Sequence, residues 1–227
     1  MKESIEMEII ARIKTDFPTK FGVPRQSGMV NTLAQIIFEP PYRNEDAIRG
    51  IEGFSHLWLI WHFSKAKREN DSLTVRPPRL GGNERVGVFA TRSPFRPNSL
   101  GLSSVKLERV EHTENGPILF VSGADLMDGT PIFDIKPYLP FTDSHPDAKA
   151  GFTEHTAHEL SVEMQADFPA SFPLDKKEQM IRALALDPRP SYHTDESRVY
   201  GMPFAGFDVR FFVKDNTLTV TEIIPLS

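Results

Sequence analysis

Short apolar segments separated by turn residues dominate the first 140 residues, and this pattern limits the possible folds most strongly. Segments of β-strand character, each bounded by Gly, Pro, Asn or Ser, lie at residues 7–13, 33–38, 54–63, 86–90, 104–110 and 118–121. Asn115-Gly116 between the last two predicts a tight hairpin turn. One short helix is predicted at about residues 44–50, with Asn44 as its N-cap and Gly50 as its terminator. Six or so strands with few helices predict a small barrel or sandwich rather than a doubly wound sheet.

The pattern changes after Tyr138, where a polar, proline-bounded connection runs over residues 140–146. Helices are predicted around residues 157–166 and, from clearer apolar periodicity, over 174–186. A strand hairpin over 207–213 and 218–224 closes the chain. We therefore expect a mainly β domain over residues 1–150 and a smaller α+β domain over 151–227.

Composition excludes several classes of protein. The 227 residues include no cysteine, which rules out disulfides, thiolate metal sites and a cysteine nucleophile. Acidic residues stand at the N-terminus without a following apolar region, and no run of about 18 apolar residues occurs, so we expect neither a secretory signal nor a membrane span. The histidines show no HExxH or HxH spacing, and no metal site is expected. Cytoplasmic residence follows as the default.

The net charge of −5 conceals a basic region. Residues 76–109 contain seven basic residues and only two acidic ones. An acidic protein with one basic face can still bind a phosphate backbone there. The alternative at this point is that these arginines are scattered, solvated surface residues.

Two short motifs resemble known sites without completing them. Glu39-Pro40-Pro41-Tyr42 is similar to the target-amine motif of Rossmann-type adenine methyltransferases, but no GxGxxG loop occurs anywhere in the chain. A loop made rigid by two prolines is the preferred interpretation. The segment 79–83 contains Gly81-Gly82 but lacks the Gly-Lys-Ser/Thr end of a P-loop, so it predicts a tight turn.

Two dense stretches carry the chemistry. Residues 87–103 (GVFATRSPFRPNSLGLS) hold Arg92 and Arg96 on backbone stiffened by prolines, which suits recognition of carboxylate or phosphate. Phe89 and Phe95 in the same stretch offer flat faces for a purine. Residues 125–138 (DLMDGTPIFDIKPY) place three carboxylates around a Gly-Thr-Pro turn. Such a group can bind a metal, act as acid and base, face a cationic ligand, or simply cap a turn.

Both stretches, with Pro24-Arg25-Gln26 and residues 50–58, 75–83 and 185–192, closely resemble the TsaA-like family, tRNA adenosine methyltransferases of the TrmO type. The resemblance covers nearly the whole chain and is strongest over 52–140. It implies a small single-sheet β-barrel that binds S-adenosylmethionine, followed by a smaller C-terminal domain, in a homodimer. It also implies the substrate: the threonylcarbamoylated adenosine 3′ of the anticodon in threonine tRNA, methylated on its exocyclic nitrogen.

The resemblance also carries over site residues. The implied cofactor contacts are Pro24, Arg25, Gln26, Ser64, Lys65, Arg92, Leu102, Asp125, Leu126, Met127 and Asp128. The family tends to have His where this chain has Ser64, so the contacts at Ser64 and Lys65 rest on a departure from the usual pattern.

Roles for these residues follow from their charges. Arg92 is expected to pair with the cofactor carboxylate, and Asp125 or Asp128 to lie near its sulfonium. Asp128 is the candidate base for the target nitrogen. Four arginines are expected to contact tRNA phosphates: Arg76, Arg79, Arg85 and Arg96. The ring of Tyr192 is expected to stack on a base of the tRNA. Two alternatives remain open: an RNA- or nucleotide-binding barrel without catalysis, and a methyltransferase with a different acceptor.

Overall fold

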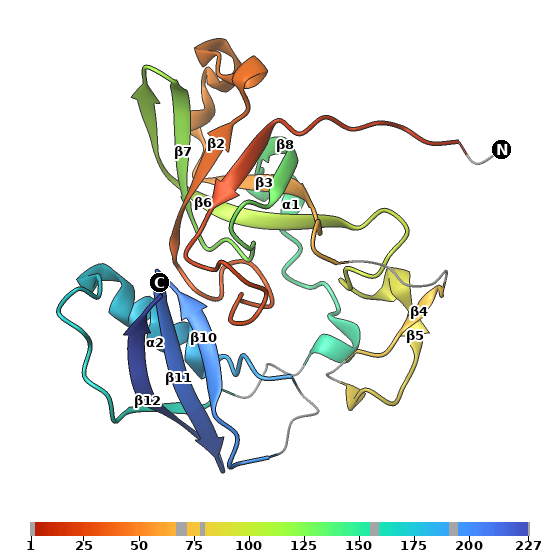
Figure 1. The fold of residues 1–227 in the computed structure, drawn as a ribbon. Helices are drawn as coiled ribbons and strands as arrows, with labels where there is room; N and C mark the ends of the chain where they lie inside the picture. The colour runs from red at the N-terminus through yellow and green to blue at the C-terminus, as the bar shows by residue number, and fades with distance from the viewer. Residues whose placement is uncertain (1–2, 67–71, 78–79, 155–158, 191–194, 227) are drawn as a thin grey trace.

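The structure, a computed structural model, describes residues 3–66, 72–77, 80–154, 159–190 and 195–226. Six strands pair antiparallel and close into a barrel in the order β1-β2-β7-β6-β3-β8, drawn in the upper part of Figure 1. They are β1 (Ala11–Lys14), β2 (Leu33–Phe38), β3 (His56–His62), β6 (Leu100–Thr113), β7 (Gly116–Ser122) and β8 (Pro131–Pro137). The predicted mainly β fold with a small barrel is confirmed.

Strict alternation along the strands builds the barrel core. In β3 the side chains of Leu57, Leu59 and Trp61 are at most 6% exposed, while the residues between them face outward. The same alternation places Ser103 and Val105 of β6 on the inner side. Successive side chains of a strand point to opposite faces, so an alternation of apolar and polar residues in the sequence predicts a half-buried strand.

Most predicted elements of this part are confirmed, with shifted ends. Residues 33–38 form β2 as predicted, and the hairpin between β6 and β7 turns at Gly116, whose φ is 98°. The predicted strand 7–13 is wrong in its first half, because regular pairing begins only at Ala11. The short helix is the 3₁₀ turn η2 (Glu45–Ile48), where the side chain of Asn44 accepts a hydrogen bond from the Asp46 N–H at 2.9 Å.

Three further segments differ from the prediction. The predicted strand 86–90 is strand only at β5 (Val86–Gly87), which pairs with β4 (Thr74–Val75), and then becomes the 3₁₀ turn η5 (Val88–Ala90). Strand β8 was not predicted, since its Asp, Lys and two Pro obscure the apolar alternation. The connection at 140–146 contains one helical turn, α1 (Pro140–Asp143).

The C-terminal part has its own sheet, in the order β10-β11-β12-β9. Its strands are β9 (Ser161–Met164), β10 (Tyr200–Phe204), β11 (Phe207–Lys214) and β12 (Thr217–Pro225). The hairpin of β11 and β12 confirms the prediction, and the predicted helix 174–186 is present as η7 (Leu174–Lys176) followed by α2 (Lys177–Ala185).

The helix predicted over 157–166 is wrong within the described residues. Its first two residues, 157 and 158, lie outside them. The rest contains β9, which pairs parallel with β12 from Ser161 opposite Thr217 to Met164 opposite Val220. An open edge of β12 therefore decides the conformation of a segment whose local pattern is ambiguous.

A segment from the N-terminal part completes the C-terminal core. Phe17 and Val30, at most 1% exposed, belong to the same cluster as Met180, Phe204 and Phe211. The ring of Phe17 meets that of Phe204 edge-on, with centroids 5.3 Å apart. The division at residue 150 stays a prediction, because this segment lies before it in sequence but packs with the residues after it.

Within the described ranges, no helix is long and apolar enough to cross a membrane.

Candidate active site and nucleic-acid interface

Gln26, Arg92 and Asp125 come together from three separate segments. Nη1 of Arg92 donates a hydrogen bond to Oε1 of Gln26. The charge of Arg92 acts on the carboxylate of Asp125 and favours its ionised form. Two prolines, Pro94 and Pro97, follow Arg92 and stiffen its loop, which supports the rigid presentation inferred from sequence.

Asp125 is held in place by two consecutive hydrogen bonds from the barrel strands. Oγ of Ser103 donates to Oδ1 of Asp125 at 2.5 Å, and Nε1 of Trp61 donates to Oγ of Ser103 at 2.9 Å. Burial raises the pKa of Asp125, while the hydrogen bond from Ser103 and the charge of Arg92 oppose the rise. The carboxylate is thus fixed in direction and partly desolvated, as suits a group that meets a cation.

The loop Pro24-Arg25-Gln26 is anchored to the C-terminal part. Pro24 is buried, and Nη2 of Arg25 donates to the backbone oxygens of Asp187 at 3.2 Å and Arg189 at 3.4 Å. A second link is the ion pair of Lys176 with Asp16, at 2.5 Å. The position of the loop therefore depends on both parts of the chain.

Asp128 lies away from this cluster in its hydrogen bonding. Its Oδ1 accepts from the backbone N–H of Thr15 at 2.9 Å, and its own N–H donates to the Phe17 oxygen at 2.8 Å. Leu126 is buried in the barrel core, and the Met127 oxygen accepts from the hydroxyl of Thr130 at 2.6 Å. The 126–128 segment therefore packs in the barrel core and holds the neighbouring backbone by hydrogen bonds. Its predicted cofactor contacts and the role of Asp128 as base stay predictions.

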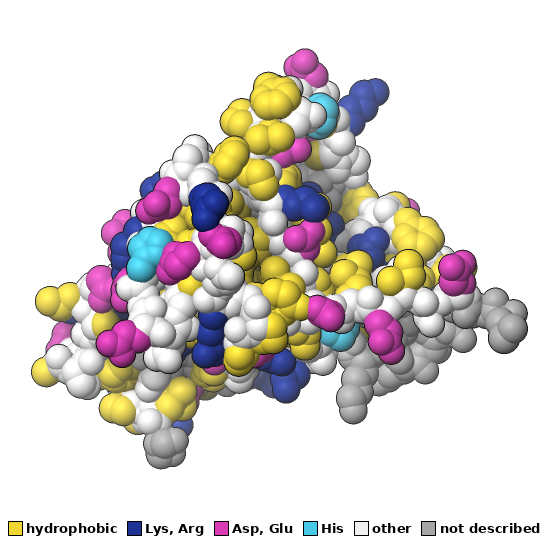
Figure 2. All heavy atoms as spheres, turned by 90° about the horizontal axis from the view of Figure 1, so that it is seen from above, with side chains coloured by type: hydrophobic (Ala, Val, Ile, Leu, Met, Phe, Trp, Pro, Cys, Tyr) yellow, Lys and Arg dark blue, Asp and Glu magenta, His cyan; other side chains and the backbone are white. Residues whose placement is uncertain are grey.

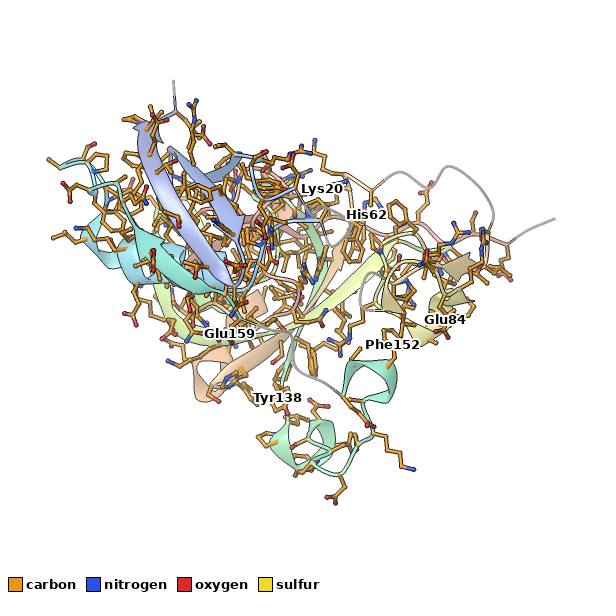
Figure 3. The ribbon with its side chains drawn as sticks, turned by 90° about the horizontal axis from the view of Figure 1, so that it is seen from below. Lys20, His62, Glu84, Tyr138, Phe152 and Glu159 are labelled. Atoms are coloured by element: carbon orange, nitrogen blue, oxygen red, sulfur yellow. The ribbon has the colours of Figure 1, made fainter. Side chains whose placement is uncertain are left out.

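The other predicted cofactor contacts lie on the outer side of the barrel and at its edge. Ser64 and Lys65 are exposed in the turn after β3, where the Lys65 oxygen accepts from Nζ of Lys20. Leu102 faces outward on β6, 57% exposed, opposite Ile60 of β3. Lys20, whose Nζ reaches this turn, and His62, the last residue of β3, are both labelled in Figure 3. No hydrogen bond among the described residues joins these three positions to Arg92 or Asp125.

A wide groove of about 1470 Å³ opens beside Arg92. Its basic lining residues are Arg25, Arg76, Arg85, Arg92 and Lys149, and its aromatic ones are Phe89, Phe95 and Phe152. None of its described lining residues is acidic. By contrast, Figure 2 shows acidic and basic side chains interspersed over the face seen from above. The groove is therefore a basic region on an acidic protein.

The groove gathers part of the predicted tRNA-binding set. Arg76 and Arg85 line it, and Nη1 of Arg85 donates to the Thr74 hydroxyl at 3.0 Å. Arg96 is not among the lining residues, and its Nη1 donates to the Thr91 oxygen at 3.1 Å. Arg79 and Tyr192 lie outside the described residues.

Two family models match consecutive parts of the chain. The model of the tRNA-methyltransferase O N-terminal domain matches residues 12–144, and that of the TrmO C-terminal domain matches 151–226. The chain belongs to the TrmO family.

Relatives of the TrmO family match over most of the chain. A tRNA (adenine(37)-N6)-methyltransferase of Escherichia coli K12 is 41% identical, over 98% of this chain and 99% of the relative. One of Eikenella corrodens is 45% identical, over 75% and 97%. A crystal structure of TrmO from Pseudomonas aeruginosa superposes with a TM-score of 0.80 at 30% identity, covering 99% of both chains.

Four residues of the site in this TrmO family member were not found from sequence. Ser103 and Trp61 hold Asp125 through hydrogen bonds across 22 and 42 positions, which no local pattern signals. Lys149 and Phe152 line the groove from the residues after the proline-bounded connection at 140–146, where the sequence predicts no site. In the strand register Ser103 lies opposite Leu59 and Trp61 lies opposite Gly101, so strand pairing alone does not signal this hydrogen bond.

Proposed function

We propose that this chain transfers a methyl group from S-adenosylmethionine to the exocyclic nitrogen of N6-threonylcarbamoyladenosine 37 in threonine tRNA. Family membership and the named relatives support an adenine(37)-N6 methyltransferase acting on tRNA. Relatives from Pseudomonas aeruginosa are named as S-adenosylmethionine-dependent methyltransferases, which supports the cofactor. The enzyme is proposed to work as a homodimer in the cytoplasm.

The single observation that carries the proposal is the cluster of Gln26, Arg92 and Asp125 at the edge of the basic groove. S-adenosylmethionine has a carboxylate and a sulfonium cation. Arg92 makes no salt bridge with any described carboxylate, and its guanidinium keeps donors for one beyond the bond to Gln26. Asp125 offers a fixed negative charge nearby. This donor set fits the two charged ends of the cofactor.

When bound, S-adenosylmethionine supplies an electrophilic methyl group. The task of this chain is then alignment, because an in-line displacement gains much of its rate from correct placement of the reacting atoms. Ser103 and Trp61 keep Asp125 in one orientation, and the anchored loop at Pro24 limits the movement of Gln26. Each contact lowers the freedom of a group that meets the cofactor.

Asp128 is retained as the proposed base for the target nitrogen, and its contacts allow a sharp test. Asn at position 128 can still accept from the Thr15 N–H, so Asp128→Asn removes the charge and keeps the turn. A base role predicts a lower kcat with unchanged thermal stability. An unchanged kcat would remove Asp128 from the chemistry.

Methyl transfer from labelled S-adenosylmethionine to threonine tRNA, with and without the threonylcarbamoyl group, tests the whole proposal. We expect label in the modified tRNA only. No label in either tRNA, with cofactor binding retained, would indicate a different acceptor. Loss of cofactor binding as well would favour an RNA-binding barrel without catalysis. Sedimentation of the free protein tests the homodimer, which a monomer at all concentrations would contradict.

A further inference from the structure

The connection between the two sheets forms one wall of the basic groove. Its 3₁₀ turn η6 (Gly151–Thr153) lies beside the β4–β5 hairpin in Figure 1, and Figure 3 shows Phe152 on that side. Lys149 and Phe152 line the same groove as Arg76, Arg85 and Phe89. The connection therefore places side chains on the surface where Arg92 also lies.

The cations of this groove are available to an anionic ligand. None of its five basic residues forms a salt bridge with a carboxylate of the described residues, whereas cations on the barrel strands, such as Arg12 and Lys136, do so. Arg85 is held by a neutral hydroxyl, that of Thr74. Unpaired like charges in a concave site raise the local concentration of an anion.

The same groove exposes large flat side chains. Phe89 is 74% exposed and Phe95 is 48% exposed, and Phe152 is half-buried. Aromatic rings between cations suit single-stranded nucleic acid, whose bases stack while the phosphates contact Lys and Arg. An acidic protein would use the charges but would not require exposed rings between them.

We propose that Phe89 and Phe152 stack on unpaired bases of the RNA and that Lys149 contacts one of its phosphates, which makes the connection at 149–153 part of the RNA-binding surface. The inference rests on the proposed function only in taking the tRNA anticodon loop as the strand. It adds a role for a segment between the two sheets. It also explains why a half-buried ring and an exposed lysine of this connection face the groove.

The stacking of Phe89 and Phe152 on bases is tested with two variants, Phe89→Ala and Phe152→Leu. The Phe152→Leu substitution removes the flat ring but keeps an apolar side chain of similar size. The measurement is the dissociation constant for an RNA hairpin carrying the threonine anticodon loop, with Phe141→Ala as control, since Phe141 is 86% exposed outside the groove. Each groove variant should bind the hairpin about 5- to 150-fold more weakly. The control should bind as the unchanged protein does.

The phosphate half is tested with Lys149→Gln, and Lys214→Gln at the end of β11 is the matched control. The slope of log affinity against log salt should fall by about one for Lys149→Gln and stay unchanged for the control. Affinity that depends on Lys149 but not on either ring would overturn stacking and indicate a fully paired RNA or an acidic protein as occupant. Affinity unaffected at all three positions would overturn the whole inference.

Two further readings separate this inference from the proposed function. Cofactor binding by calorimetry should be unchanged in all three variants. If the unchanged protein methylates adenosine 37 and the groove variants do so with the same KM, the proposed function stands and the inference fails. If the unchanged protein neither binds the hairpin nor transfers methyl, both fail.

Discussion

Asp125 is a partly buried carboxyl group whose charge is opposed by its surroundings. Desolvation raises its pKa, and the hydrogen bond from Ser103 and the charge of Arg92 only reduce that rise. A group with a raised pKa binds its proton more tightly in the folded state than in the unfolded chain. Ionisation of Asp125 therefore lowers the free energy of unfolding.

Replacing Asp125 by Asn should therefore raise the melting temperature near neutral pH. The gain should begin as pH rises above about 3.9, the usual aspartate pKa, and reach its full size above the raised pKa of the folded state. Asn can still accept from Ser103, so packing is retained. Calorimetric melting of both proteins across this pH range is the measurement, and a lower Tm for the variant at neutral pH would contradict it.

Ser103→Ala should destabilise the barrel. Trp61 is only 6% exposed, and the variant leaves its Nε1 without the acceptor now at 2.9 Å. An unsatisfied buried donor costs about 1–3 kcal/mol. Urea unfolding measures the loss, and Ser104→Ala, on the outward side of the same strand, is the control, expected to change the free energy of unfolding by about 0.5 kcal/mol at most. Equal stability of both variants would show that Trp61 finds another acceptor.

At the scale of elements, the pairing of β3 with β6 positions the residues that hold Asp125. Trp61 of β3 lies opposite Gly101 of β6, and its ring fills the space that a side chain there would occupy. Ser103, two residues further along β6, faces the same side and reaches Asp125. The Trp61 ring therefore requires glycine at position 101 and donates its hydrogen bond to Ser103.

Gly101→Ala should disrupt that pairing. A Cβ atom at position 101 would come within 2.2 Å of the Trp61 ring, which is fixed in the core. Overpacking of this kind costs about 1–3 kcal/mol. Thermal unfolding is the measurement, with Gly53→Ala as control, since a Cβ there meets nothing within 4 Å. If the Gly101 variant were as stable as the control, β3 and β6 would have to move apart at this point without lowering the free energy of unfolding.

At the scale of the whole molecule, the segment around residues 16–30 joins two cores. Phe17 and Val30 pack beneath the C-terminal sheet, and Asp16 pairs with Lys176. The loop at Pro24-Arg25-Gln26 lies within this segment. The geometry of the candidate site is therefore coupled to the packing of the C-terminal part.

Phe17→Ala should lower the free energy of unfolding by about 3–5 kcal/mol, because the side chain is fully buried against Phe204. Far-UV circular dichroism during urea unfolding measures the total loss. Both tryptophans, Trp58 and Trp61, lie in β3, so fluorescence reports the barrel separately. Phe141→Ala is the exposed control. A small loss, equal to that of the control, would contradict a shared core.

The sequence alone determined most of the barrel strands and the motifs that mark the site. The alternation of β3, the run of β2 and the turn at Gly116 are local features, set by side-chain period and backbone preference, so a sequence displays them. The prolines after Arg92 and the carboxylates from Asp125 onward are likewise visible as residue types.

Only the tertiary structure decided how these parts meet. Residues 161–164 become a strand because β12 offers a free edge, and β8 forms because β1 and β3 flank it. Ser103 reaches Asp125, Phe17 enters the second core, and Phe152 lines the groove through contacts between residues far apart in the chain. Such contacts depend on the whole set of pairings and on burial from water, which no short window of sequence contains.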